Sequence, residues 1–425
     1  MYPALVVAPK TAKAVWTHEF TKWAPHRAVT VVDGSATKRR QQLEAESDVF
    51  VVNWEALRIH SRIATYGSTR LGPGENTPKE LNRPWRAVVA DEAHRAINPK
   101  AKQTRALWAI RDTADFAFPL TGTPIADTPD DFWALLHFIN PAEWPSRPKF
   151  IDRYCETTWN AFGGVDVVGL KATNRQEFYD LTNPRMLRRP KALVLPWLPE
   201  KVYEPRMVEM PPKQARAYKQ FKEEMVADLD GGLGTAFDNL SVLTRLSQLA
   251  SASLEINEDG NIRMVAPSSK VDALVELLED MGNAPLVVFA QSRQLIDLAA
   301  ERLERDGITF STVVGGQSSL IRDTAVEHFM NGDVRVILCT MGAGSESITL
   351  TRADTVCFMN RSWSLIENRQ AEDRIHRVGQ DSNKCVIVDL IAPNTVDEAQ
   401  HAAVAAKSDR LEEIVRDREA LRRML

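Results

Sequence analysis

Short runs of β-branched and aliphatic residues recur along the chain. Each run is followed by a polar or glycine-containing turn and then by residues with helical periodicity. Continuous apolar runs of this length are typical of strands buried on both faces, as in parallel sheets. They fall into an early set at 5–8, 49–52, 87–90 and 116–120, and a late set at 286–289, 309–314, 334–339, 355–359 and 385–390. The pattern predicts two separate α/β units with parallel sheets.

The stretch between the two sets has a different composition. Residues 141–270 lose the strand rhythm and are richer in Pro, so we expect a mainly helical connector there. The predicted divisions are a first lobe at 1–140, a helical linker region at 141–270, and a second lobe at 271–425 that ends in a charged helix. Between residues 171 and 219, eleven basic residues stand against five acidic ones. This excess fits either a surface for phosphate backbones or a solvated helical face.

Composition limits the partners and the compartment. The chain has 53 Lys and Arg against 57 Asp and Glu, so a nucleic acid would have to be held by a local basic surface. The four cysteines are far apart and form no Cys-x-x-Cys pair, which favours a reducing, intracellular location over a disulfide framework or a zinc site. No stretch reads as a signal peptide or a membrane span, so we expect a cytoplasmic protein without membrane contact.

Two adjacent carboxylates follow the apolar run at 87–90. Asp91 and Glu92 come at the carboxyl end of that predicted strand and are followed by Ala93 and His94. Parallel sheets bind ligands at this edge. Asp91 could hold Mg²⁺ through its water shell, and Glu92 could orient or deprotonate a water that attacks a phosphate.

Two further motifs could complete this chemistry. The next predicted strand runs into Thr121, Gly122 and Thr123, whose hydroxyls can hydrogen-bond the acidic motif, although the same residues also suit an ordinary turn. Far downstream, Arg374 and Arg377 are three positions apart and are expected on one helical face. Such guanidinium groups can stabilise charge on a transferring phosphoryl group, and a surface or ion-pair role is the alternative.

The chain resembles the Swi/Snf family of superfamily 2 helicase-like ATPases in three motifs and in their order. These motifs are Asp91-Glu92-Ala93-His94, Thr121-Gly122-Thr123-Pro124 and the string from Gln370 to Gln380. The Gln-Ala-Glu-Asp-Arg part of the last string is similar to the annealing-helicase branch and its bacterial and phage relatives. Further stretches resemble the family's motifs Ia, Ib, the basic linker, IV, IVa and V, at 5–10, 51–55, 186–191, 286–289, 315–316 and 340–350. The resemblance covers almost the whole chain.

The resemblance implies two RecA-like lobes and a DNA-dependent ATPase or translocase that uses ATP and Mg²⁺ to move along or remodel duplex or branched DNA. It implies catalytic roles for Asp91, Glu92, His94, Arg374 and Arg377, with Asp91 holding Mg²⁺ through water. ATP would be bound by the same acidic pair and arginines together with Thr121, Gly122, Thr123 and Gln370. Nucleic acid would contact Lys10, Thr11, Asn53, Arg188, Arg189, Gln291, Ser292, Gly315, Gly316, Thr340 and Gly344. Gly344 is expected to let a phosphate come close to the backbone.

Motors of this family also need a glycine-rich loop with Lys and Ser or Thr, whose backbone N–H groups and ammonium hold the phosphates. The sequence contains no such loop. Residues 1–10 already resemble motif Ia, so we expect the loop to lie outside the sequence and the first lobe to be incomplete. The chain alone is therefore expected to be inactive or weak. Two alternatives to a motor stay open: a non-hydrolysing DNA-binding or regulatory module, and one part of a split enzyme completed in trans by a partner.

Overall fold

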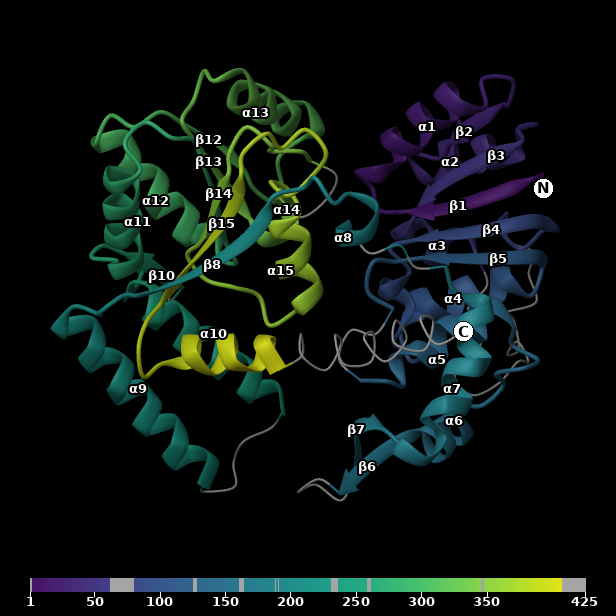
Figure 1. Ribbon diagram of the computed structural model, residues 1–425, viewed down its shortest axis with the longest axis horizontal. Coiled ribbons are helices and arrows are strands. Elements are labelled where there is room, and N and C mark those ends of the chain that lie inside the picture. The colour runs from purple at the N-terminus through teal and green to yellow at the C-terminus, as the bar shows by residue number, and fades with distance from the viewer. Residues whose placement is uncertain are drawn as a thin grey trace. The chain divides into compact units, whose positions relative to one another are not determined.

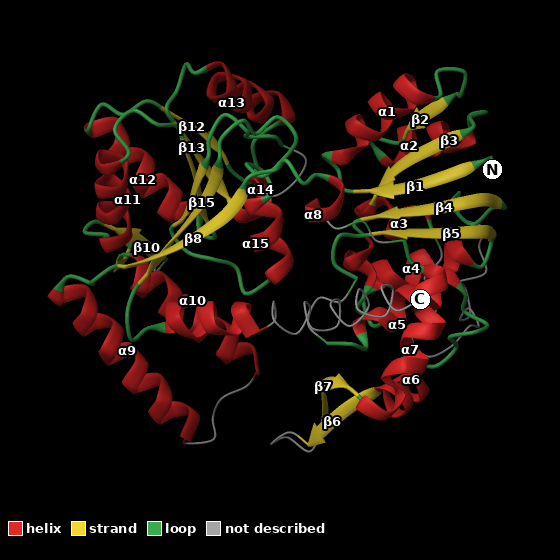
Figure 2. Ribbon diagram, in the orientation of Figure 1, coloured by secondary structure: helices red, strands yellow, loops and turns green. Residues whose placement is uncertain are grey.

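The computed structural model describes residues 2–61, 80–124, 128–159, 164–187, 189, 191–230, 236–257, 261–344 and 348–406. The chain divides between residues 188 and 189 into two compact units. Figures 1 and 2 show each unit as a sheet with helices packed against it. The single division falls inside the segment that the sequence predicts as a connector.

Unit 1 is built on a five-stranded parallel sheet with the strand order β2-β3-β1-β4-β5. Its strands are β1 (Ala4–Ala8), β2 (Val29–Val31), β3 (Val49–Asn53), β4 (Trp85–Asp91) and β5 (Ala114–Leu120). β1 and β3 are buried along their whole length, as expected for continuous apolar runs. The short strand β2 was not predicted, because its three residues are only partly buried and Thr30 interrupts the apolar pattern.

Helices cover both faces of this sheet. The α-helices are α1 (Ala12–Trp23), α2 (Ala36–Glu44), α3 (Leu57–His60), α4 (Lys102–Arg111), α5 (Asp131–Ile139), α6 (Arg147–Tyr154) and α7 (Arg175–Thr182). The 3-10 helices are η1 (Trp54–Ala56), η2 (Ala93–Ala96), η3 (Ala172–Asn174) and η4 (Asn183–Arg185), and a hairpin is formed by β6 (Cys155–Trp159) and β7 (Val165–Leu170). Helix α1 packs on β1 and β3 through Ala12, Trp16 and Phe20. Helices α4 and α5 contact β5.

Part of β5, the outermost strand on its side of the sheet, is uncovered. Phe116, Phe118 and Leu120 alternate along the strand and so point to one face, and they are 43%, 40% and 41% exposed. Val89 of β4 is in register with Phe118 and packs with the residues beneath α1. The three exposed side chains therefore lie on the α1 face. Among the described residues, that face is covered over β1 and β3 and left open over β5.

Unit 2 is built on a six-stranded parallel sheet with the order β12-β13-β11-β14-β15-β8. Its strands are β8 (Glu200–Met207), β11 (Leu286–Ala290), β12 (Phe310–Val313), β13 (Val336–Thr340), β14 (Thr355–Phe358) and β15 (Lys384–Ile391). Successive residues of β11 divide between two core clusters, with Leu286 and Val288 in one and Val287 and Phe289 in the other. The central strand is thus buried on both faces. The predicted fold class, two parallel-sheet α/β lobes, is confirmed.

The segment 141–270 contains strands as well as helices. Strand β8 was not expected, yet its eight residues pair with β15 along their whole length. Its sequence mixes charged with apolar residues, and all of its residues are exposed or only partly buried, as is usual for an edge strand. Two further unexpected pairs in this segment are the hairpin of β6 and β7 and the pair formed by β9 (Ser253–Ile256) and β10 (Ile262–Val265).

The helices of unit 2 complete the two covering layers. They are α8 (Lys191–Val194), α9 (Pro212–Asp230), α10 (Ala236–Ser251), α11 (Ser269–Asp280), α12 (Arg293–Arg305), α13 (Ser319–Asn331), α14 (Met341–Gly344) and α15 (Leu365–Glu372), followed by a helix over 396–406. In the part of the chain that the structure describes, no helix combines the length and the apolar character needed to cross a bilayer.

Candidate functional site

The carboxyl edge of the unit 1 sheet gathers residues that are distant in sequence. The last residue of β1 pairs with Asn53 of β3, and Asp91 at the end of β4 pairs with the last residue of β5. Lys10 and Thr11 follow β1 by two and three residues, and Thr121 follows β5 directly. Parallel register therefore places all five predicted site residues along one edge, where α/β sheets bind their ligands.

Two tryptophans hold Asp91. Trp16 Nε1 of α1 donates to Asp91 Oδ2 at 2.8 Å, and Trp54 Nε1 donates to the Asp91 carbonyl oxygen at 2.9 Å. Burial raises the pKa of Asp91, and the neighbouring charge of Glu92 adds to this, while the hydrogen bond from Trp16 acts in the opposite direction. A bound cation would also favour the charged carboxylate. Neither tryptophan was predicted, because each lies on an element whose own pattern says nothing about Asp91.

Glu92 has a left-handed backbone, with φ 52° and ψ 49°. This conformation costs a residue other than glycine about 1 kcal/mol and is found at functional sites more often than elsewhere. Glu92 precedes η2, and its Oε2 lies 3.2 Å from His94 Nδ1. The turn therefore brings the second carboxylate back against the histidine two residues later.

His94 also contacts the next strand end. Its Nδ1 lies 3.3 Å from Thr121 Oγ1, and the backbone N–H of Thr123 donates to that same oxygen at 3.1 Å. Gly122 is exposed, with no atom within 4 Å of the position that a Cβ would take. The threonine motif is thus a turn, as one reading of the sequence has it, and its contact with the acidic motif runs through His94.

The side chains at this edge suit a magnesium ion and a phosphate. Asp91 and Glu92 supply hard carboxylate oxygens, which Mg²⁺ prefers and binds through its retained waters. Asp91 is only partly buried. The Asp91 carboxylate can therefore face a hydrated ion, while Glu92 is oriented by His94.

The carboxyl edge of the unit 2 sheet collects a second group of predicted residues. The last residue of β11 pairs with Thr340, the last residue of β13, so Gln291 and Ser292 follow beside it. Gln291 is exposed, and its backbone N–H donates to Asn360 Oδ1 at 2.8 Å.

Gly315 and Gly316 follow β12 at the same edge and are exposed. A Cβ at Gly315 would meet no atom within 4 Å, and Gly316 has φ +88°. Gly315 thus leaves its backbone open to a close approach. Gly316 adopts a backbone conformation that a side chain would strain.

The geometry corrects the reason given for Gly344. A Cβ there would lie 2.7 Å from Cβ of Cys339 and 2.7 Å from ring atom Cε1 of Phe289. Glycine is therefore required by the packing of α14 against β11 and β13, and the side of Gly344 that lacks a Cβ faces the core. The expected approach of a phosphate to this position does not explain the residue type.

The other residues predicted to contact nucleic acid differ in exposure. Lys10 and Arg189 are exposed and Thr11 is partly exposed, whereas Asn53 and Thr340 are only 5% and 8% exposed. Asn53 Nδ2 donates to Glu55 Oε2 at 2.5 Å. Arg188 lies outside the described residues.

Arg374 and Arg377 do not share a helical face, and this expectation is wrong. Helix α15 ends at Glu372, and both arginines follow it. The backbone N–H groups of Arg374 and Ile375 donate to carbonyls three residues earlier, at 3.1 and 3.3 Å. The chain therefore tightens into a turn after Asp373.

Both arginines contact the segment that resembles motif V. Arg374 is 5% exposed, and it donates from Nε to the Gln370 carbonyl at 2.9 Å and from Nη1 to the Ile348 carbonyl at 3.1 Å. Arg377 Nη1 donates to Thr349 Oγ1 at 3.2 Å. The structure thus brings the motifs at 340–350 and 370–380 together within unit 2.

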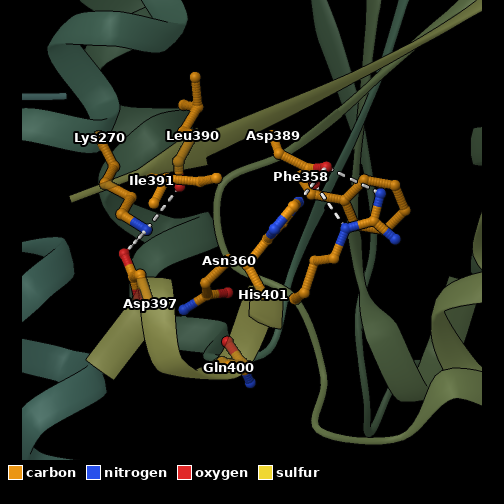
Figure 3. Close-up of a pocket in the computed structure, with 10 residues that line it drawn as sticks. Lys270, Phe358, Asn360, Asp389, Leu390, Ile391, Asp397, Gln400 and His401 are labelled. Carbon is orange, nitrogen blue, oxygen red and sulfur yellow. Dashed lines mark hydrogen bonds and ion pairs between the residues drawn. The ribbon is translucent and has the colours of Figure 1, made fainter. Parts of the chain in front are cut away.

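A small polar cavity lies at the carboxyl ends of β14 and β15 (Figure 3). The fully buried Lys270 donates to the Leu390 carbonyl at 2.9 Å and pairs with Asp397. Among the residues that the structure describes, Oδ1 of Asp397 and Nε2 of Gln400 have no hydrogen-bond partner. The cavity measures about 10 Å³, which is room for about one water. Its size and its unpaired polar atoms suit a bound water and exclude a nucleotide.

Two family models match the chain. Residues 1–255 match the SNF2-related domain, and residues 269–379 match the helicase conserved C-terminal domain. Among curated proteins, the chain is 27% identical over 398 residues to protein CHROMATIN REMODELING 5 of Arabidopsis thaliana, covering 89% of this chain and 22% of that protein. It is 25% identical over 402 residues to the human DNA annealing helicase and endonuclease ZRANB3, covering 93% of this chain and 35% of that protein.

The chain is also similar to a bacterial protein and to a solved structure. An uncharacterized ATP-dependent helicase of Mycoplasma pneumoniae is 26% identical over 415 residues, covering 96% of this chain and 36% of that protein. The chain thus spans between about a fifth and about a third of the length of these relatives. The Sulfolobus solfataricus SWI2/SNF2 ATPase core in complex with dsDNA is 24% identical, with a TM-score of 0.42, covering 97% of this chain and 82% of that chain.

Proposed function

The chain belongs to the SNF2-related family of helicase-like ATPases, and from that premise we propose that it forms the ATPase core of a DNA translocase. In this proposal the core hydrolyses ATP with Mg²⁺ to move along or remodel duplex or branched DNA. An intracellular location follows from such a substrate.

The observation that carries the proposal is the contact chain Glu92–His94–Thr121 beside Asp91 at one edge of a parallel sheet. The distances of 3.2 and 3.3 Å link the carboxylate to the end of the neighbouring strand through one imidazole. A water near Glu92 would thereby be oriented by a side chain whose own position depends on the threonine turn. General bases need such fixed geometry before they need a shifted pKa.

Each residue has a separate task in this proposal. Asp91 would hold the waters of Mg²⁺, and when bound the ion neutralises charge on the phosphates. Glu92 would accept a proton from the attacking water, and His94 would keep the Glu92 carboxylate in place. Thr121, Gly122, Thr123 and Gln370 would lie near the nucleotide. Arg374 and Arg377 would stabilise negative charge on the transferring phosphoryl group.

DNA would bind through exposed residues at the carboxyl edges of the two sheets and through Arg189, which precedes α8. Among the described residues, Lys10, Arg189, Gln291, Gly315 and Gly316 are the exposed members of the group implied by the family resemblance. Contacts to phosphates and to the backbone position a protein on DNA without reading its sequence. We therefore propose binding with a strong salt dependence and little sequence preference.

Phosphate release by the purified chain, with and without duplex or branched DNA, tests the proposal. Glu92→Gln is expected to lower DNA-stimulated release by about 100-fold or more, because a positioned base contributes that much, while DNA binding measured by anisotropy stays unchanged. Glu46→Gln, at an exposed site on the same unit, is the matched control and should behave as the unmodified chain. Turnover that survives Glu92→Gln would refute the assignment.

A second candidate is a DNA-binding or regulatory module that does not hydrolyse ATP. Such a module would use the same exposed residues to hold DNA and would need no phosphate loop. DNA binding without turnover in the same assay supports it. Turnover that appears only when a second polypeptide with a phosphate loop is added supports a split enzyme completed in trans.

A further inference from the structure

Two adjacent acidic residues stand directly before Arg374, and basic residues from the start of unit 2 hold them. Lys201 Nζ of β8 lies 3.0 Å from Glu372 Oε2 and 3.1 Å from Asp373 Oδ1. Lys191 Nζ of α8 lies 2.8 Å from Asp373 Oδ2. Lys201 thus bridges both acids, and Asp373 bonds to both lysines.

Glu372 is buried, and its three side-chain partners come from two other segments, strand β8 and the loop after β14. Its Oε1 accepts from Arg361 at 2.8 Å, and its Oε2 accepts from the Tyr203 hydroxyl at 3.0 Å in addition to Lys201. Arg361 also bonds to both carboxylate oxygens of Asp389, at 2.6 and 3.0 Å. Burial raises the pKa of Glu372, but the charges of Lys201 and Arg361 outweigh it and keep that pKa below its usual value. With 3% of the residue exposed, removal of one partner would leave a poorly compensated buried charge.

The turn that carries the two arginines is tied to the same part of the chain. His376, between Arg374 and Arg377, accepts at its carbonyl from Lys191 Nζ at 3.2 Å. Its ring Nε2 donates to the Pro199 carbonyl at 2.9 Å. Residues 191–203 therefore hold both the acidic pair before the turn and the histidine within it.

We propose that Lys201 is a positioning residue for Arg374 and Arg377. It acts through Glu372 and Asp373, whose side chains it joins, and so sets the point at which the chain leaves α15 and turns. The proposal rests on the proposed function for the role of the two arginines in turnover, and their placement can be measured without turnover.

Arginine labelling with phenylglyoxal, followed by peptide mass spectrometry, measures that placement. In Lys201→Met, labelling of Arg374 and Arg377 is expected to become about tenfold faster, because loss of one buried charged hydrogen bond favours local opening by that factor or more. Lys201→Arg, which keeps the charge, should restore slow labelling. Lys213→Met, at an exposed lysine of the same unit, is the matched control. Arg335, bound to the carbonyls of Ala284 and Leu278, is the internal reference and should label at an unchanged rate.

Two results would overturn the proposal. One is labelling of Arg374 and Arg377 in Lys201→Met at the rate of the unmodified chain. The other is equal acceleration at Arg335, which indicates general loosening of unit 2. If Lys201→Met does not fold, the same labelling measurement is made on Tyr203→Phe. This variant lacks the hydroxyl that donates to Glu372, and labelling of Arg374 and Arg377 is expected to accelerate by a smaller factor.

Turnover separates this proposal from the proposed function. If the unmodified chain hydrolyses ATP, Lys201→Met should lower kcat and leave KM for ATP unchanged, and Lys201→Arg should restore kcat. If the unmodified chain shows no turnover, the motor function fails for this chain, and the labelling rates still confirm or refute the placement role of Lys201.

Discussion

Replacement of Gly344 by alanine distinguishes a packing role from a phosphate-contact role. The new Cβ would sit 2.7 Å from atoms of Cys339 and Phe289, about 0.7 Å inside ordinary contact, and both neighbours belong to fully buried strands. Overpacking of this kind costs about 1–3 kcal/mol, offset by about 0.5–1 kcal/mol from replacing a helical glycine. We expect a net loss of about 1–2 kcal/mol in the free energy of unfolding of unit 2.

Urea denaturation followed by circular dichroism measures this loss. Gly342→Ala is the matched control, since it lies in the same helix and its Cβ would meet no atom within 4 Å. It should keep or slightly raise the stability. DNA affinity per folded molecule should be equal in the two variants. Equal stability together with weaker DNA binding in Gly344→Ala would refute the packing argument and restore the phosphate-contact explanation.

Three further changes test other parts of the molecule. Phe118→Lys places a charge on the open face of β5 and should reduce self-association at high protein concentration, measured by sedimentation velocity. Unchanged self-association would show that this face does not mediate contacts between molecules. Trp16→Phe removes the hydrogen bond that favours the charged form of Asp91, so a carboxyl ¹³C titration should find the pKa raised further, and a lowered pKa would contradict the reasoning. The hydrogen bonds from Arg153 and from Tyr154 lower the pKa of Glu177 to about 2 from 4.5. These contacts of Glu177 therefore stabilise unit 1 above about pH 4.5 and stop doing so as the pH falls toward 2. Glu177→Gln should remove that part of the pH dependence of unfolding, and an unaltered profile would count against these contacts.

Strand positions could be predicted wherever burial on both faces makes the sequence continuously apolar. β1, β3 and β11 are such strands. Strand β8 could not be found in this way, because it is an edge strand in which charged residues are mixed with apolar ones and none is buried. Its position depends on pairing with β15, which lies almost two hundred residues later in the sequence.

In the candidate site, too, some contacts could be predicted from the sequence and others could not. The proximity of Asp91 and Thr121 follows from parallel register, so two adjacent strands in the sequence suffice to predict it. The indole of Trp16 reaches Asp91 from a helix, and only the packing of that helix on the sheet determines the contact. The end of α15 before Arg374 was missed because helical spacing alone does not reveal where a helix stops.

Strand β8 also determines how a pulling force on the chain before it would act on unit 2. From the unit boundary the chain passes through α8 and then into a strand whose eight residues are paired with β15. A pull along such a strand strains all of the hydrogen bonds to β15 in shear at the same moment, whereas peeling would open them one after another. Because Lys201 lies in this strand and bonds to Glu372, the last residue of α15, tension in the connecting chain would also act on the turn after α15.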